Sequence, residues 1–233
     1  MKTLGPEEIE KKSFEIIAEE LETRRRGEGR RSPARTPAEE AVLRRVIHAT
    51  ADFSYDKTLV FTNDAARIGI ELLRAGTWIV TDTQMAMAGI NKKRLARCHG
   101  QVRCFMADDD VAEAAKAGGT TRAAAAVDKA ALLGVPLIFA VGNAPTALMR
   151  LHELIRRGRL LPKLVIAVPV GFVQVEESKT LFETAGFPCI IARGRRGGST
   201  VAAAIINALL YQEPEEIPGS RLSLAGAGHR RLL

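Results

Sequence analysis

The chain has 233 residues, 46% of them hydrophobic, which suits one globular α/β domain and excludes a disordered protein. Most of its net charge of +7 lies in residues 24–35, and because only two tyrosines and one tryptophan are present in the chain, we expect no nucleic-acid partner. No apolar run reaches the roughly 20 residues of a membrane span, the N-terminus lacks a secretion signal, and the three cysteines have no CxxC spacing. We therefore expect a cytoplasmic protein without membrane contact, disulfide framework or metal site.

The start of the chain predicts a helix followed by a basic loop. Residues 6–22 form the helix, which begins at Pro6 and carries Ser13 within an apolar stripe made of Ile9, Ile16, Ile17 and Leu21. Residues 24–35 follow with six arginines, two glycines and a proline. This composition is typical of a mobile, solvated Arg-rich loop, and binding of an anionic small substrate there stays open.

A second helix is predicted from the capping box of Thr36 and Glu39 to about Phe53. Arg45 and His48 are one turn apart, so they share its polar face. A histidine is the usual proton donor in catalysis, and an arginine beside it would hold an anionic substrate. The residues alone leave open a simpler interpretation, in which His48 is a solvated surface side chain.

From there the pattern alternates between strand and helix. Apolar runs predict buried strands at residues 59–61, 77–82, 102–106, 136–141, 163–170 and 188–193. Helices are predicted at residues 64–75, 110–131, 144–157, 175–185 and 198–211. The alternation indicates a single α/β domain over residues 1–233, built as three α/β/α layers around a mostly parallel sheet, with a peripheral tail at 212–233.

Ligands of such a sheet bind beyond the carboxyl ends of its strands. Four of those ends are rich in Gly, Pro, Asn, Asp or Arg, and we expect the substrate-binding candidates there: Asn143, Thr146, Gly171, Arg195, Gly197, Gly198 and Ser199. The segment 193–199 opens a helix, and amides at a helix start bind carboxylates or phosphates. It matches neither GxGxxG nor GxxxxGK[ST], but a phosphate- or nucleotide-binding α/β enzyme using Arg193–Ser199 stays open as an alternative.

Seven stretches carry a family resemblance in one order along nearly the whole chain. They are KSFEII (12–17), RRVIHATADF (44–53), TDTQMAMAGI (81–90), GGTTRAAAAV (118–127), GNAPTAL (142–148), PVGFVQVEESK (169–179) and RGRRGGSTVAAAIINAL (193–209). Together they resemble the precorrin-8X methylmutase (precorrin isomerase) family of corrin-ring biosynthesis. The Arg-rich loop and the tail after Tyr211 depart from the family pattern.

The resemblance implies an isomerase of cobalamin (vitamin B12) biosynthesis. Family members move a methyl group from ring carbon 11 to ring carbon 12 of precorrin-8X or cobalt-precorrin-8, giving hydrogenobyrinic or cobyrinic acid. The resemblance further implies no separate cofactor, since cobalt, where present, arrives within the tetrapyrrole, and a homodimer with active sites near the subunit interface. His48 matches the catalytic histidine, and Ser13, Arg45 and Arg122 match residues that face the substrate.

Two further interpretations stay open. A protein that only carries a corrinoid would hold the same anionic tetrapyrrole without converting it. The Arg-rich loop, which the family pattern does not explain, is a candidate for docking a neighbouring enzyme of the pathway. Both the metal-free and the cobalt-containing substrate fit the same motifs.

Overall fold

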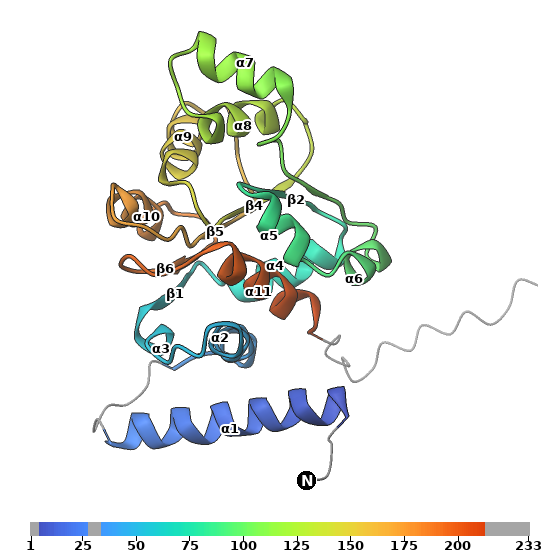
Figure 1. The fold of residues 1–233 in the computed structure, drawn as a ribbon, viewed down its shortest axis with the longest axis vertical. Coiled ribbons are helices and arrows are strands. Elements are labelled where there is room, and N and C mark those ends of the chain that lie inside the picture. The colour runs from blue at the N-terminus through green and yellow to red at the C-terminus, as the bar shows by residue number, and fades with distance from the viewer. Residues whose placement is uncertain (1–4, 28–33, 213–233) are drawn as a thin grey trace, which may run out of the picture.

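The computed structural model describes residues 5–27 and 34–212. Its centre is a six-stranded sheet with the strand order β1-β6-β5-β4-β2-β3 (Figure 1). Neighbouring strands run parallel except at one edge, where β1 is antiparallel to β6. The mostly parallel sheet expected from the sequence is therefore confirmed. The strands are β1 Leu59–Thr62, β2 Trp78–Thr81, β3 Val102–Arg103, β4 Leu137–Val141, β5 Leu164–Ala167 and β6 Cys189–Ala192.

The central strands form where the apolar runs predict them because both of their faces are covered. Every residue of β4, β5 and β6 is buried. Except for β1, which is one residue longer than predicted, the strands are shorter than the apolar runs. The difference is clear at β3, which spans two of the five residues predicted at 102–106. The residues that follow each strand turn out of the sheet and are available to build a site.

Helices cover both faces of the sheet (Figure 1). On one face, α4 (Ala65–Arg74), α5 (Gln84–Gly89), α6 (Lys92–Arg97) and α11 (Ser199–Leu210) pack against the strands. On the other face lie α7 (Asp109–Ala117), α8 (Arg122–Ala131), α9 (Pro145–Arg156) and α10 (Val175–Glu183). Outside α11 lies α2 (Pro37–Thr50), beside the single turn α3 (Tyr55–Thr58), and α1 (Pro6–Gly27) lies outside both as the outermost layer.

The second helix begins and ends for local reasons. The Thr36 hydroxyl accepts from the Glu39 amide and the Glu39 carboxylate accepts from the Thr36 amide, which confirms the predicted capping box. The helix ends at Thr50, before the predicted residue 53, because Ala51 adopts a left-handed conformation and caps it. The chain then turns into α3, a helix that the sequence pattern did not predict.

Two helical predictions are wrong. Residues 110–131 form two helices rather than one, because Gly118 and Gly119 end α7 and the Thr121 hydroxyl caps α8 through the Ala124 amide. The stretch between β2 and β3 was predicted without helices but forms α5 and α6. Both are six residues long, too short for a periodic pattern, and each starts at a capping side chain, Thr83 or Asn91.

The Arg-rich loop also begins later than predicted. Residues 24–27 belong to the last turn of α1, and Arg35 at the other end has a side chain only 7% exposed. Residues 28–33 lie outside the described residues. Within the part of the chain that the structure describes, no helix is long and apolar enough to cross a membrane.

Candidate active site

The sheet has a switch point between β2 and β4. The chain leaves β2 toward β3 on one side and later places β4 on the other side of β2. The crevice beyond the carboxyl ends of two such strands is where ligands bind in open parallel sheets. The two strands run into residues 82–84 and 142–144, and these loops are where the site is built.

A buried carboxylate shapes one of these loops. Asp82 is 6% exposed and accepts hydrogen bonds from the amides of Gly142, Asn143 and Ala144, at 2.8, 2.7 and 2.7 Å. Burial raises the pKa of Asp82, and the three amides oppose that rise. Asp82 thereby fixes the backbone of the loop after β4, while the Asn143 side chain remains exposed beyond the strand.

The same loop lies against the start of α11. A Cβ atom on Gly142 would lie 2.8 Å from the Gly198 oxygen and from the Ser199 nitrogen, so only glycine fits there. The Ser199 hydroxyl lies 2.7 Å from that of Thr83, which follows β2. The structure thus brings three strand ends together at the first turn of α11, where free amides favour an anion.

The loop from β6 to α11 is held against the end of β5. The Gly198 amide donates to the Val168 carbonyl at 2.8 Å, and the Gly171 amide donates to the Arg195 carbonyl at 3.1 Å. A side chain on Gly197 would collide with the Val168 carbonyl. Arg195 points outward, over the Phe172 ring at 5.6 Å. Gly171, Arg195, Gly197, Gly198 and Ser199 therefore lie in one neighbourhood, as predicted.

A third group of candidates lies where α8 and α9 begin. The hydroxyls of Thr121 and Thr146 are 2.9 Å apart and join the two helix starts. Arg122 opens α8 next to this bond, but its exposed side chain lines a hollow with Glu113 and Lys116 of α7. The structure therefore places Thr146 near the sheet edge and does not bring Arg122 into contact with the α11 start or with His48.

His48 and Arg45 share one face of α2, as predicted, and both contact Phe14 of α1. The imidazole of His48 stacks on the Phe14 ring at 5.0 Å between centroids and 22° between planes. The Arg45 guanidinium lies 4.7 Å from the same ring and 4.9 Å from that of Tyr211. It also pairs with Glu10 at 2.5 Å. His48 itself is exposed, so its proton is available to a ligand.

Ser13 lies beside Phe14 on α1, half-buried. Its hydroxyl donates to the Ile9 carbonyl at 2.8 Å. The apolar stripe predicted around it is only partly correct, because Ile17 and Leu21 are buried while Ile9 and Ile16 are 53% and 52% exposed. Ser13 therefore does not face a closed core. It lies near the surface on the helix whose Phe14 stacks on His48.

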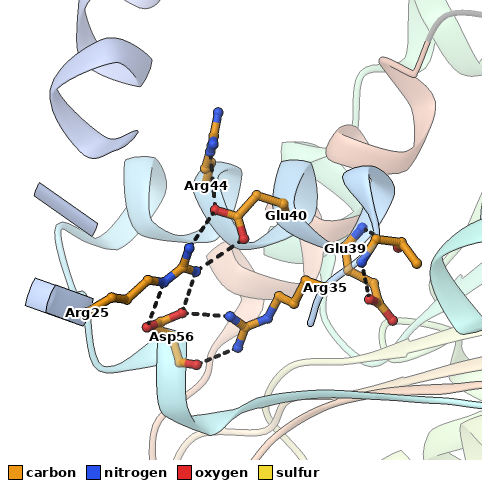
Figure 2. A network of polar contacts seen from close by, with 7 residues as sticks. Arg25, Arg35, Glu39, Glu40, Arg44 and Asp56 are labelled. Carbon is orange, nitrogen blue, oxygen red and sulfur yellow. Dashed lines mark hydrogen bonds and ion pairs between the residues drawn. The ribbon is translucent and has the colours of Figure 1, made fainter. Parts of the chain in front are cut away.

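An ionic cluster ties α1 to α2 and α3 (Figure 2). The Asp56 carboxylate accepts from Arg25 at 2.7 Å and from Arg35 at 2.6 Å, and Arg25 also pairs with Glu40 at 3.2 Å. Burial opposes the charge of Asp56, but the hydrogen bonds from the two arginines outweigh it and hold its pKa below the ordinary value. The cluster thus anchors the C-terminal end of the helix whose other half carries Phe14.

Comparison with known proteins decides the family. The family model described as precorrin-8X methylmutase matches residues 8–212. The chain belongs to the precorrin-8X methylmutase family. Among its relatives, a cobalt-precorrin-8 methylmutase of Priestia megaterium is 42% identical over 89% of this chain and 88% of its own length. One of Salmonella typhimurium is 45% identical over 88% of this chain and 95% of its own length.

Solved structures agree with this assignment. A crystallographic study of the precorrin-8X methylmutase of Thermus thermophilus gives a structure that is 40% identical, with a TM-score of 0.77 over 88% of this chain and 94% of that one. Methylmutases rearrange a molecule without changing its composition, so this family member is an isomerase, and its pathway is cobalamin biosynthesis.

Several residues of this candidate site were not identified from the sequence. Phe14 and Glu10 contact Arg45, and Asp82 fixes the loop after β4. Lys179 of α10 donates hydrogen bonds to two carbonyls of the β6–α11 loop. Two of these residues carried a usable signal, since Asp82 ends a predicted strand and Lys179 falls on the apolar stripe of its helix. Within residues 5–27 and 34–212, no three His, Cys, Asp or Glu side chains gather closely enough to hold a metal ion.

The hollows of the methylmutase lie beside these groups. One of about 430 Å³ is lined by Phe14, Arg45 and Tyr211. Another, of about 1060 Å³, lies between α7, α8 and α9 and reaches the sheet edge at Thr146 and at Gln174, just before α10. The groups around His48 and α11 combine an exposed imidazole with cationic and amide groups, and they are the candidate active site.

Proposed function

We propose that the chain converts cobalt-precorrin-8 to cobyrinic acid by moving a methyl group from ring carbon 11 to ring carbon 12, with His48 as the proton donor. The observation that carries the proposal is the position of His48, exposed on α2, stacked on Phe14 and one turn from Arg45. The motif that contains it matches that of the family's catalytic histidine. The preference for the cobalt form rests on the two relatives named above, whose names specify it.

The reaction is a rearrangement within one molecule. The bond from the methyl group to ring carbon 11 breaks and a bond to ring carbon 12 forms, so no atom or electron is gained or lost. His48 would donate a proton, or a hydrogen bond, to a ring nitrogen and so draw electron density as the methyl group moves. The proton returns when the product leaves, and the protein supplies position and one acid. No separate cofactor takes part in this scheme.

Carboxylates on the rim of the tetrapyrrole would bind to cationic and amide groups of this chain. Arg45 is held over Phe14 and Tyr211 and can exchange Glu10 for a substrate carboxylate. Arg195 and the amides at the start of α11 offer a second receiver near Gly197 and Ser199. Ser13, Asn143, Thr146 and Gly171 would complete the contacts, and Arg122 would join them from the start of α8.

A homodimer would close this open site. Val170, Phe172 and Val173 at the end of β5 are 46%, 82% and 79% exposed, an apolar edge beside the candidate binding loop. A second copy of the chain would shield the substrate from water on that side. Docking of a neighbouring pathway enzyme at the Arg-rich loop, and a place in the cytoplasm, remain predictions from the sequence.

The deciding experiment is an anaerobic absorbance assay with cobalt-precorrin-8 and with precorrin-8X on the wild type and on His48→Ala. We expect turnover by the wild type and a loss of about 100- to 10,000-fold in the variant, the usual contribution of a general acid. Binding of cobyrinic acid should persist, because Arg45 and the α11 start remain. His99→Asn, which changes another exposed histidine, is the matched control and should retain activity.

Other outcomes would overturn the proposal in different ways. Tight binding without conversion by the wild type would identify a corrinoid carrier. Thermal stabilisation by ATP or NAD, without corrinoid binding, would favour the phosphate-binding alternative. An active His48→Ala variant would assign the proton to another group. Turnover of precorrin-8X alone would correct the choice of the cobalt form.

A further inference from the structure

A lysine is buried behind the loop that opens α11. Lys179 of α10 is 1% exposed and lies on the buried stripe with Val175, Ser178 and Phe182. Among the described residues, no carboxylate lies within ion-pair distance of its ammonium group. Glu176, one turn earlier, pairs instead with Arg195 at 3.1 Å. Lys179 therefore introduces an unpaired positive charge into the interior, which is costly unless hydrogen bonds compensate it.

The compensation comes from the backbone of the loop. The Lys179 ammonium donates to the Gly194 carbonyl at 2.7 Å and to the Arg196 carbonyl at 2.8 Å. The carbonyl between them, that of Arg195, accepts from the Gly171 amide at 3.1 Å. Three consecutive carbonyls of the loop thus accept hydrogen bonds. Two of them accept from the buried Lys179 ammonium, and the third accepts from the Gly171 amide. Consequently the loop turns the guanidinium of Arg195 outward, with an exposed side chain.

We propose that Lys179 is a positioning residue for substrate binding, which sets the β6–α11 loop so that Arg195 and the amides of Gly197 and Ser199 receive a carboxylate of the tetrapyrrole. The inference rests on the proposed function, because it assigns this loop to the substrate. Lys179 does not touch the substrate. It acts through two carbonyls, and its charge adds to the positive end of α11.

The charge, and not only the shape, of Lys179 matters to this role. A neutral, apolar side chain of the same length would avoid the desolvation of an ammonium ion, but it would leave two carbonyls without donors. Burial lowers the pKa of Lys179 to about 8, against a weaker opposing effect of Glu176. The ammonium form therefore prevails below that pH and is lost above it.

The test compares Lys179→Met and Lys179→Arg in the full chain, with kcat, KM, the Kd for cobyrinic acid and the Tm measured for each. We expect Lys179→Met to raise KM and Kd about tenfold while kcat changes little, because the proton donor is untouched. Lys179→Arg, which restores the donors, should recover most of the affinity. Lys129→Met is the matched control, since that lysine pairs with Asp108 and Asp110 far from the loop.

The pH dependence of the Kd distinguishes this role from a merely structural one, because a lysine that only stabilised the fold would not change that dependence. The wild-type Kd should rise above about pH 8, whereas that of Lys179→Arg should stay level. The other charged groups around this loop form three ion pairs, which join Glu176 of α10 to Arg195, Glu183 of α10 to Arg193, and Asp52 to Arg196. Carboxylates, imidazoles and guanidiniums do not ordinarily titrate between about pH 8 and 10.

Three results separate this inference from the proposed function. A wild type that neither binds nor converts the tetrapyrrole refutes the proposed function. A working wild type with an unchanged Kd in Lys179→Met refutes only the role of Lys179. If Lys179→Met does not fold, the pH series on the wild type and Lys179→Arg decides alone, and equal profiles for the two would overturn the inference.

Discussion

The polar face of α2 and the carboxyl edge of the sheet both present substrate-binding candidates, but different forces hold them in place. On α2, side chains of α1 position the functional groups. Phe14 stacks on His48 and Arg45, and an ion pair joins Arg45 to Glu10. At the sheet edge, buried charges position the backbone. Asp82 binds three amides of one loop and Lys179 binds two carbonyls of another.

The difference concerns what must move for a ligand to bind. Stacking and an exposed ion pair are weak and reversible, so a substrate can displace Glu10 from Arg45 at small cost. Buried charges with several hydrogen bonds are expensive to disrupt, so the loops after β4 and β6 keep their shape. The helix face is therefore suited to admitting the ligand, and the sheet edge to fixing its orientation.

The largest effect should follow from breaking the sheet edge at Asp82. Asp82→Ala leaves the amides of Gly142, Asn143 and Ala144 without acceptors, at a cost of about 4 kcal/mol in unfolding free energy. Thermal unfolding should show a lower Tm. Activity assays at low temperature, where the variant remains folded, should show a raised KM because the loop after β4 loses its shape. Asp128→Ala is the control, since that carboxylate pairs with Arg150 near the surface. Equal Tm losses in the two variants would contradict the special role of Asp82.

A smaller effect is expected where α1 is anchored. Asp56→Asn removes the charge that holds Arg25 and Arg35, and should lower the free energy of unfolding by about 2 kcal/mol. Amide hydrogen exchange should accelerate more in α1 than in α10. Because the folded pKa of Asp56 is held below its ordinary value, its contribution is present above about pH 4 and is lost as the pH falls through the folded value. The wild type should therefore lose free energy of unfolding as the pH falls below about 4, and Asp56→Asn should lose less over the same pH range.

The control for this change is Asp64→Asn, which removes an exposed carboxylate from its pair with Arg67. High salt should imitate Asp56→Asn only in part, because the side chains of Asp56 and Arg35 are 15% and 7% exposed and little screened. If α1 exchanges no faster in Asp56→Asn than in Asp64→Asn, the ionic cluster does not anchor it.

Sequence patterns predicted the parts of this molecule that depend on neighbours along the chain. The strands β4, β5 and β6 follow from uninterrupted apolar runs, and the start of α2 follows from Thr36 and Glu39. The shared face of Arg45 and His48 follows from helical spacing alone. The grouping of Gly171, Arg195 and Ser199 follows from the rule that ligands bind beyond the strand ends of parallel sheets.

What sequence patterns missed depends on residues that are distant along the chain. The sequence pattern places Arg35 in a solvated loop, yet its side chain is only 7% exposed because it pairs with Asp56. Asp82 reads as a strand end, and its three amide partners lie sixty residues onward. The antiparallel pairing of β1 with β6 joins residues over a hundred positions apart, and no local pattern specifies its direction.

The smallest effect is expected at the link between the two regions. Arg196, in the β6–α11 loop, lies 2.8 Å from Asp52 just after α2, but its side chain is 59% exposed. Arg196→Gln should therefore change the unfolding free energy by less than about 1 kcal/mol, as should the control Arg157→Gln, which removes an exposed pair with Glu153. Combined with Asp82→Ala, its effect should add within about 0.5 kcal/mol, because the regions are held independently. A larger coupling would mean that Arg196 makes the helix face and the sheet edge one cooperative unit, in which displacing Glu10 would also disturb the loops.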